Sequence, residues 1–120
     1  MRIIYALDKF RAREGGADGF ARGVTAALMA AGHQVRVIEA GAQTEEIPGE
    51  SFSLVSRPLP KPRLLRDGDW ITLHWNLLWA EILPREIDAW KAEVILTQNQ
   101  LAPASILAAK AAGLPSVIFF

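Results

Sequence analysis

Two adjacent glycines, Gly15 and Gly16, stand where a ligand could approach the backbone closely. They follow an apolar run at 3–7 that ends at Asp8, and they precede a stretch with helical spacing. Glycine has no Cβ, so a bound group can come close to the chain there. The free N–H groups of the first helical turn, at 17–19, could bind an anion or sugar hydroxyls. The alternative is that the two glycines only form a turn.

A second set of candidate side chains follows the apolar run at 70–74. His74 could hydrogen-bond to a ligand, or it could be a neutral histidine satisfied by the backbone. Trp75 and Trp79 could stack on a sugar ring, although the common role of a buried tryptophan is to fill the core. Asn76 directly follows Trp75 and is expected in the same crevice as the two glycines. These residues are expected at the carboxyl end of a strand.

Asn99 follows a further apolar run, at 93–97, and could bind hydroxyls or cap the next helix. In an open parallel sheet the carboxyl ends of the strands meet along one edge, and ligands bind outside that edge. The sequence therefore predicts one shared binding site with these residues: Gly15, Gly16, His74, Trp75, Asn76 and Asn99.

The elements that would position this site begin with a strand, helix and strand over residues 1–39, a βαβ unit that is right-handed in nearly all folds. Gly32 suits the end of the helix, because glycine tolerates the left-handed conformation found there. One face of the helix is expected to pack on the sheet: Phe20, Val24, Ala27, Leu28 and Ala31.

The whole pattern predicts an α/β fold, a Rossmann-like open parallel sheet of about six strands with helices on both faces. Residues 41–50 are expected in a loop, and the prolines at 57–62 favour an extended connector before a turn at 66–69. Strands are expected at 3–7, 35–38, 52–55 (at an edge), 70–74, 93–97 and 116–120. Helices are expected at 77–90, broken or kinked by Pro84, and at 104–112.

Composition narrows the class of protein. The 120 residues are 51% hydrophobic and 22% charged, which is typical of one globular domain. The formal net charge is zero, so no nucleic-acid partner is expected. There is no cysteine, which favours a cytoplasmic protein. The dinucleotide and P-loop glycine patterns are absent, the two histidines are far apart, and no cofactor or metal is expected.

Basic residues cluster in two expected loops: Lys9, Arg11 and Arg13 in one, and Arg57, Lys61, Arg63 and Arg66 in the other. Such clusters are usually solvated surface. The alternative is that they attract phosphates or an anionic membrane, so peripheral membrane contact stays open.

The opening sequence resembles that of group 1, family 4 glycosyltransferases with the GT-B fold, which have a strand, a Gly-Gly loop, an amphipathic helix and then GH-x-V-x-V. Here these are Gly15-Gly16, Gly32-His33, Val35 and Val37. Two later stretches also resemble the family. Asp69, Ile71 and His74 fit D-V-V-H-x-H, with Thr72 in place of its first histidine, and AAKAAGLPSVIFF is similar to A-x-x-x-G-I-P-x-V.

The resemblance implies that residues 1–120 are a single Rossmann-like domain, the N-terminal, acceptor-side part of a longer two-domain chain. The parent enzyme would transfer a sugar from a nucleotide sugar to an acceptor with retention of configuration. Gly15 and Gly16 would approach the donor, and the other candidate residues would line the acceptor side. Without its partner, the donor-binding domain, this part would be inactive. Its apolar last strand would favour self-association.

An alternative function stays open: a non-catalytic interaction or ligand-binding module, such as one chain of a split glycosyltransferase. A flavodoxin-like or response-regulator domain is a weaker alternative, because a regulator needs an acidic cluster at its strand ends and only Asp8 is available.

Overall fold

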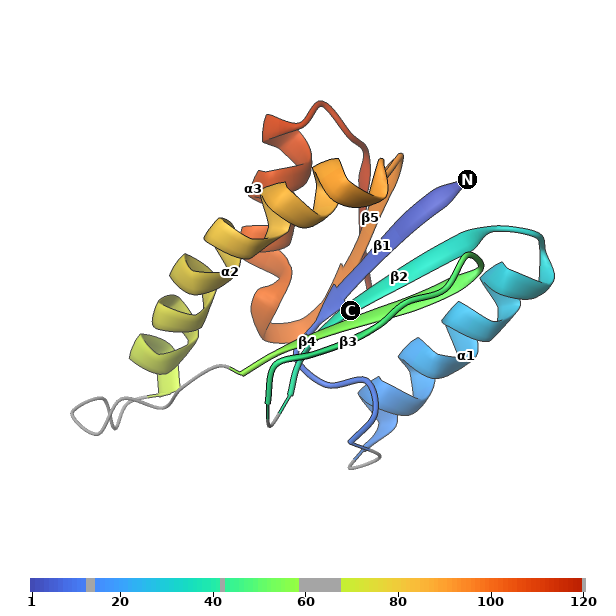
Figure 1. The fold of residues 1–120 in the computed structure, drawn as a ribbon. Coiled ribbons are helices and arrows are strands. Elements are labelled where there is room, and N and C mark those ends of the chain that lie inside the picture. Colours follow the sequence, from blue (N-terminus) through green and yellow to red (C-terminus); the bar gives the residue numbers. More distant parts are fainter. Residues whose placement is uncertain (13–14, 42, 59–67, 120) are drawn as a thin grey trace.

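The structure, a computed structural model, describes residues 1–12, 15–41, 43–58 and 68–119. Its described part forms one six-stranded sheet with helices on both faces (Figure 1), which confirms the predicted fold class. The strands are β1 (Arg2–Leu7), β2 (Gln34–Ala40), β3 (Glu45–Ile47), β4 (Phe52–Arg57), β5 (Val94–Gln98) and β6 (Ser116–Phe119). The helices are α1 (Gly16–Ala30), α2 (Gly68–Trp90), the 3₁₀ turn η1 (Asn99–Leu101) and α3 (Ala102–Ala111).

The strand order is β3-β4-β2-β1-β5-β6, and every neighbouring pair is parallel except β3 and β4. From β1 the chain continues to β2, toward the β3 edge of the sheet, whereas from β5 it continues to β6, the opposite edge. Helix α1 therefore covers one face, while α2 and α3 cover the opposite face (Figure 1). The crevice between the carboxyl ends of β1 and β5 is a topological switch point, the usual ligand position in this architecture.

Alternate residues of the central strands fill two apolar layers. Ile4 and Ala6 face α2 and α3, whereas Ile3, Tyr5 and Leu7 face α1. All five are almost completely buried, as expected for a parallel strand covered on both faces. Because β1 is anchored on both sides, the loop that follows it starts from a rigid base.

The prediction of a strand at 70–74 is wrong, because these residues belong to α2. A short apolar run fits a buried strand or a buried helix equally well, and here the longer pattern decides. Trp75, Trp79 and Leu83 recur four residues apart and pack on the sheet. The helix also continues through Pro84 instead of breaking into two. Among the described helices, none is long and apolar enough to cross a membrane.

The predictions for the sheet edge also need correction. Residues 52–55 lie in β4, between β2 and β3, and the edge strand on that side of the sheet is β3, inside the loop expected at 41–50. β3 has the sequence Glu-Glu-Ile and shows no apolar alternation, and both of its glutamates form ion pairs. Glu45 Oε2 lies 2.9 Å from Arg11 Nη2, and Glu46 Oε1 lies 3.0 Å from Arg36 Nη2.

Two smaller predictions fall partly outside the described residues. In the expected turn at 66–69, Gly68 and Asp69 begin α2, and the other two positions are not described. In the expected connector at 57–62, Arg57 ends β4, and 59–62 are not described.

The buried face of α1 differs from the predicted one. Phe20, Ala27 and Ala31 are exposed, and the helix instead buries Asp18, Ala21 and Thr25. Small residues allow the helix to lie close to the sheet, and partly buried Val24 and Leu28 complete the contact. The large ring of Phe20 is thereby left at the surface.

Candidate functional site

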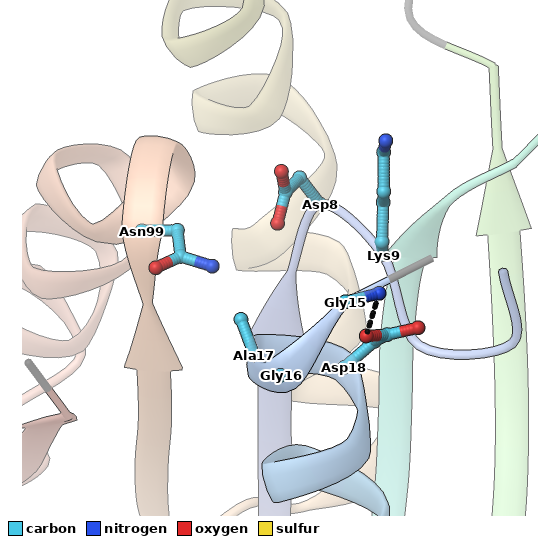
Figure 2. Close-up of a pocket in the computed structure, with 7 residues that line it drawn as sticks. All are labelled: Asp8, Lys9, Gly15, Gly16, Ala17, Asp18 and Asn99. Carbon is cyan, nitrogen blue, oxygen red and sulfur yellow. Dashed lines mark hydrogen bonds between the residues drawn. The ribbon is translucent and has the colours of Figure 1, made fainter. Parts of the chain in front are cut away.

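A pocket of about 310 Å³ lies at the carboxyl ends of β1 and β5, beside the N-terminus of α1 (Figure 2). Its walls come from the loop after β1, the first turn of α1 and the start of η1. The lining residues are Asp8, Lys9, Gly15, Gly16, Ala17, Asp18 and Asn99. The pocket therefore occupies the switch point of the sheet.

The N-terminus of α1 is held by a short network. Gly15 precedes the helix in an extended conformation, and its N–H donates to Asp18 Oδ1 at 3.0 Å. Arg22 Nη1 donates to Asp18 Oδ2 at 3.3 Å and to the carbonyl oxygen of Phe10 at 2.7 Å. Both oxygens of the buried Asp18 carboxylate are thus engaged by the protein, and the loop is tied to the helix that follows it.

The backbone of the first turn of α1 faces the pocket. The N–H groups of Gly16 and Ala17 belong to the first helical turn, so no carbonyl within the helix can accept from them. The helix dipole adds partial positive charge at this end. A Cβ added at Gly15 or Gly16 would meet no atom within 4 Å, so the backbone here faces open space. These features suit a phosphate or a cluster of hydroxyl groups.

The opposite wall of the pocket is fixed by Gln98 at the end of β5. Its Oε1 accepts from the hydroxyl of Tyr5 at 2.6 Å, and its Nε2 donates to the carbonyl oxygen of Ala17 at 2.9 Å. One side chain therefore links β1, β5 and α1. This link holds the start of α1 against the carboxyl ends of β1 and β5, next to Asn99 in the pocket wall.

Burial raises the pKa of Tyr5 from 10.0 to about 12. The folded state therefore keeps a proton that the unfolded state loses, and stability falls as pH rises from 10.0 toward 12. The loss is at most about 3 kcal/mol, at about 1.4 kcal/mol for each pKa unit. Tyr5 is the only tyrosine, so the ultraviolet absorbance of its phenolate reports this group alone. We expect an absorbance midpoint near the upper value, and a midpoint near 10 in the folded protein would contradict this environment.

Asn99 and Asp8 supply the side-chain chemistry of the pocket. Asn99 begins η1 with φ 60°, a left-handed conformation that asparagine tolerates better than most residues. In the part of the chain that the structure describes, no residue forms a hydrogen bond or ion pair with the Asp8 carboxylate. Figure 2 shows Asp8 and Asn99 on opposite sides of the opening. A carboxylate and an amide facing each other in this way can bind hydroxyl groups from two directions.

Two substitutions at Asn99 separate its backbone role from its amide. Asn99→Ala is expected to destabilise the protein by about 1 kcal/mol, because alanine resists positive φ, whereas Asn99→Gly keeps the conformation. Both variants remove the amide from the pocket. Chemical unfolding measures the difference. Equal stability of the two variants would show that the positive φ at position 99 does not destabilise the alanine variant.

The structure brings together three of the six predicted site residues, Gly15, Gly16 and Asn99. The other three lie on α2 and do not line this pocket. Trp75 packs against the apolar layer beneath α2 and α3, and His74 is partly exposed.

Asn76 links α2 to the segment that follows β5. Its Nδ2 donates to the carbonyl oxygens of Thr72 and Gln100, both at 2.8 Å. Its Oδ1 accepts from the N–H of Ala104 at 2.9 Å. Its amide thus holds η1, which begins with Asn99, in place.

The six predicted site residues did not include Asp8, Lys9, Ala17 and Asp18, although the sequence indicated the backbone N–H groups at 17–19 as an anion site and Lys9 as part of a basic loop. A signal for Asp8 was present, because it directly follows the central strand on the side where ligands bind. The role of Asp18 at the helix start depends on its third position in α1, a common place for an acidic residue.

The first basic loop is partly neutralised. Arg11 donates to Glu39 and Glu45, and hydrogen bonds to Glu45 and then Glu39 raise the pKa of Arg11. Of the second basic loop, only Arg57 lies within the described residues. Over the described ranges, no group of three or more histidine, aspartate or glutamate side chains could hold a metal ion.

No family model matches this chain, and no curated protein matches its sequence. Solved structures do match its fold. The C-terminal domain of PF1911 hydrogenase from Pyrococcus furiosus aligns with a TM-score of 0.73 at 10% identity, covering 99% of this chain and 90% of that domain. Sucrose-phosphate synthase from Thermosynechococcus elongatus aligns with a TM-score of 0.71 at 12% identity, covering 98% of this chain.

A third match is a UGT transferase from Siraitia grosvenorii in complex with UDP, with a TM-score of 0.62 at 14% identity over all of this chain. At these identities the likeness establishes the fold. The chain has the Rossmann-like fold of one part of these GT-B glycosyltransferases. It spans 32% of the synthase and 24% of the UGT transferase, so it corresponds to only part of each.

Proposed function

We propose that this chain is the N-terminal, acceptor-side part of a glycosyltransferase that moves a sugar from a nucleotide sugar to an acceptor. The observation that carries the proposal is the polar pocket at the switch point, where a helix N-terminus, a carboxylate and an amide converge. The likeness to sugar-transferring enzymes along nearly the whole chain supports it.

In this proposal the helix start binds the negatively charged part of the donor. The N–H groups of Gly16 and Ala17 would donate to a phosphate oxygen, and the absence of side chains on Gly15 and Gly16 lets it approach. The Asp8 carboxylate would accept from an acceptor hydroxyl, and the amide of Asn99 would bond to a neighbouring one. Catalysis would then depend on positioning and on stabilising the leaving diphosphate.

The residues on α2 have different roles in the proposal. His74 and Trp75 would contact only a ligand that extends beyond the pocket toward α2. Asn76 is a positioning residue, because its amide is already bonded to Thr72, Gln100 and Ala104.

The finer points rest on the resemblance of the sequence to group 1, family 4 enzymes. They are retention of configuration, a second domain that supplies most of the contacts to the nucleotide while the start of α1 contacts the donor phosphates or sugar, and no turnover by residues 1–120 alone. A cytoplasmic location is also part of the proposal, and the lack of cysteine is compatible with it. Any contact with an anionic membrane would involve the second basic cluster of the sequence, which begins at Arg57.

The test is the intact mass and activity of the protein purified from its native cells. The proposal expects a mass about three times that of this chain, because the rest of the acceptor-side domain and a second domain of ordinary size would be attached. It also expects transfer from a nucleotide sugar, with the anomeric configuration of the product kept, as read by NMR. A mass equal to this chain together with no transfer would overturn the enzyme proposal.

One observation favours a second candidate function, a ligand-binding or interaction module. The chain covers 90% of the hydrogenase domain, so the same fold occurs as a compact domain of similar size outside sugar transferases. In a split glycosyltransferase the chain would instead be purified with a separate donor-binding protein. The mass of the chain is the same for a module and for a split enzyme, so the co-purified donor-binding protein, together with transfer activity, distinguishes them.

Self-association through β6 is a further expected result. This strand ends the sheet, and Val117 on it is 43% exposed. An open apolar edge can pair with another copy. Size-exclusion chromatography with light scattering should show dimers of this chain at high concentration, and Val117→Lys should return it to monomer. A monomer at every concentration would contradict this.

A further inference from the structure

A second, smaller pocket adjoins the polar one. It has a volume of about 170 Å³ and is lined by Ala17, Phe20, Gln98, Asn99 and Phe119. Ala17 and Asn99 line both pockets, so the two spaces are neighbours. We call this smaller space the aromatic pocket.

Two phenylalanine rings give the aromatic pocket its character. The rings of Phe20 and Phe119 meet edge to face, with centroids 5.2 Å apart and an interplanar angle of 71°. Phe119 also lies against the buried Tyr5, with centroids 5.9 Å apart. Phe119 is therefore held from behind, while Phe20 remains 50% exposed. Such an exposed ring beside a hollow offers apolar area to a ligand.

The polar groups around the aromatic pocket are few. Gln98 is engaged at both ends of its amide, by Tyr5 and by Ala17. Asn99 is the other polar side chain in the lining, and none of the lining residues is charged. An apolar ring would leave no buried charge unpaired there. Cavities of about 150 Å³ hold a benzene ring, so the available volume suits one aromatic ring.

We propose that the aromatic pocket binds the ring of an aromatic alcohol, with its hydroxyl group directed past Asn99 into the polar pocket. Its ring would contact Phe20 and Phe119, and the shared lining would place its oxygen near the sugar site. The description of this ligand as the sugar acceptor rests on the proposed function above. The binding of the ring itself rests only on the geometry of the pocket.

The experiment uses amide-correlation NMR and fluorescence with this chain. Umbelliferone, a fluorescent phenol, is the aromatic probe, methyl glucoside is the non-aromatic probe, and UDP-glucose is the donor probe. We expect umbelliferone to shift the amides of Ala17, Phe20 and Phe119. Phe20→Ala should weaken its binding about tenfold, since ring contacts and buried apolar area are both lost. Phe20→Leu should recover part of the affinity.

Leu107→Ala is the matched control, because Leu107 is also an exposed apolar residue but lies on α3, on the other face of the sheet. It should bind umbelliferone like the unchanged protein. Equal binding by Phe20→Ala, or binding of methyl glucoside at the aromatic pocket instead, would overturn the proposal.

The failure of this inference differs from the failure of the proposed function. UDP-glucose could shift the amide resonances of Gly15 and Gly16 while umbelliferone binds nowhere near Phe20. In that case the proposed ligand of the aromatic pocket is wrong, and the transferase proposal is unaffected. If umbelliferone binds beside Phe20 and UDP-glucose shifts no amide, the aromatic pocket is supported and the transferase proposal loses its main support.

Discussion

Replacing Trp79 with alanine is expected to lower the free energy of unfolding by about 3–5 kcal/mol. Trp79 is completely buried, in the apolar layer between α2 and the sheet. Truncation would remove its transfer free energy and leave a large cavity. Since a domain of this size has a total stability of about 5–15 kcal/mol, much of the protein would unfold at moderate temperature.

Urea unfolding of Trp79→Ala measures this effect, with two controls. Trp79→Phe should cost much less, because a ring stays in place and the indole N–H, which has no acceptor among the described residues, is removed. Trp75→Ala should also cost less, since Trp75 is only partly buried. A change below about 1 kcal/mol for Trp79→Ala would contradict a core position and reopen the role in ligand binding considered from the sequence.

The second large effect is expected at Gly16, where Gly16→Val should strongly weaken ligand binding in the polar pocket without unfolding the protein. Gly16 lines that pocket, and a side chain there would occupy space that no atom fills. It would also keep a phosphate away from the N–H groups of the first helical turn. We expect affinity for UDP-glucose to fall by at least about tenfold, a difference of 1.4 kcal/mol or more.

Gly23→Val is the matched control for that variant. Gly23 lies in the same helix, is exposed and also has no atom within 4 Å of an added Cβ, but it does not line the pocket. The Gly23→Val variant should be slightly more stable than the unchanged protein, since valine is a better helix former than glycine. If Gly23→Val weakened binding as much as Gly16→Val, the effect would be on the helix and not on the pocket.

Local signals in the sequence were sufficient for the first βαβ unit. A buried strand, two glycines and a helix ended by Gly32 are each determined by residues close together in the chain. Gly32 adopts φ 90°, as its position after the helix required. Local signals of the same kind, with the apolar run at 93–97, placed Gly15, Gly16 and Asn99 at the carboxyl ends of the strands. All three line the pocket.

The parts that could not be predicted depend on contacts between distant residues. The run at 70–74 is as apolar as a strand, and its helical state is decided by the packing of Trp79 and Leu83 on the sheet. Strand β3 carries two glutamates, and its pairing with β4 and its ion pairs to Arg11 and Arg36 are all contacts with residues distant in the sequence. Without these partners in view, a charged segment is expected to be a loop.

The same limit applied to side-chain roles. Asn76 has the chemistry of a sugar-binding residue, but tertiary hydrogen bonds to Gln100 and Ala104 engage its amide. Phe20 has the hydrophobicity of a core residue, but the smaller Ala21 and Thr25 occupy the buried face of α1. Hydrophobicity alone could not show which side of the helix faces the sheet.

The most direct test of the central claim is an NMR titration of this chain with UDP-glucose, following each backbone amide. We predict shifts confined to Gly15, Gly16, Ala17 and Asn99, saturating with added ligand and lost in Gly16→Val but not in Gly23→Val. This result would establish the switch-point pocket as the sugar-nucleotide contact of the domain. Absence of any shift, or shifts at the far end of the sheet around Ile87 and Leu114, would contradict the account.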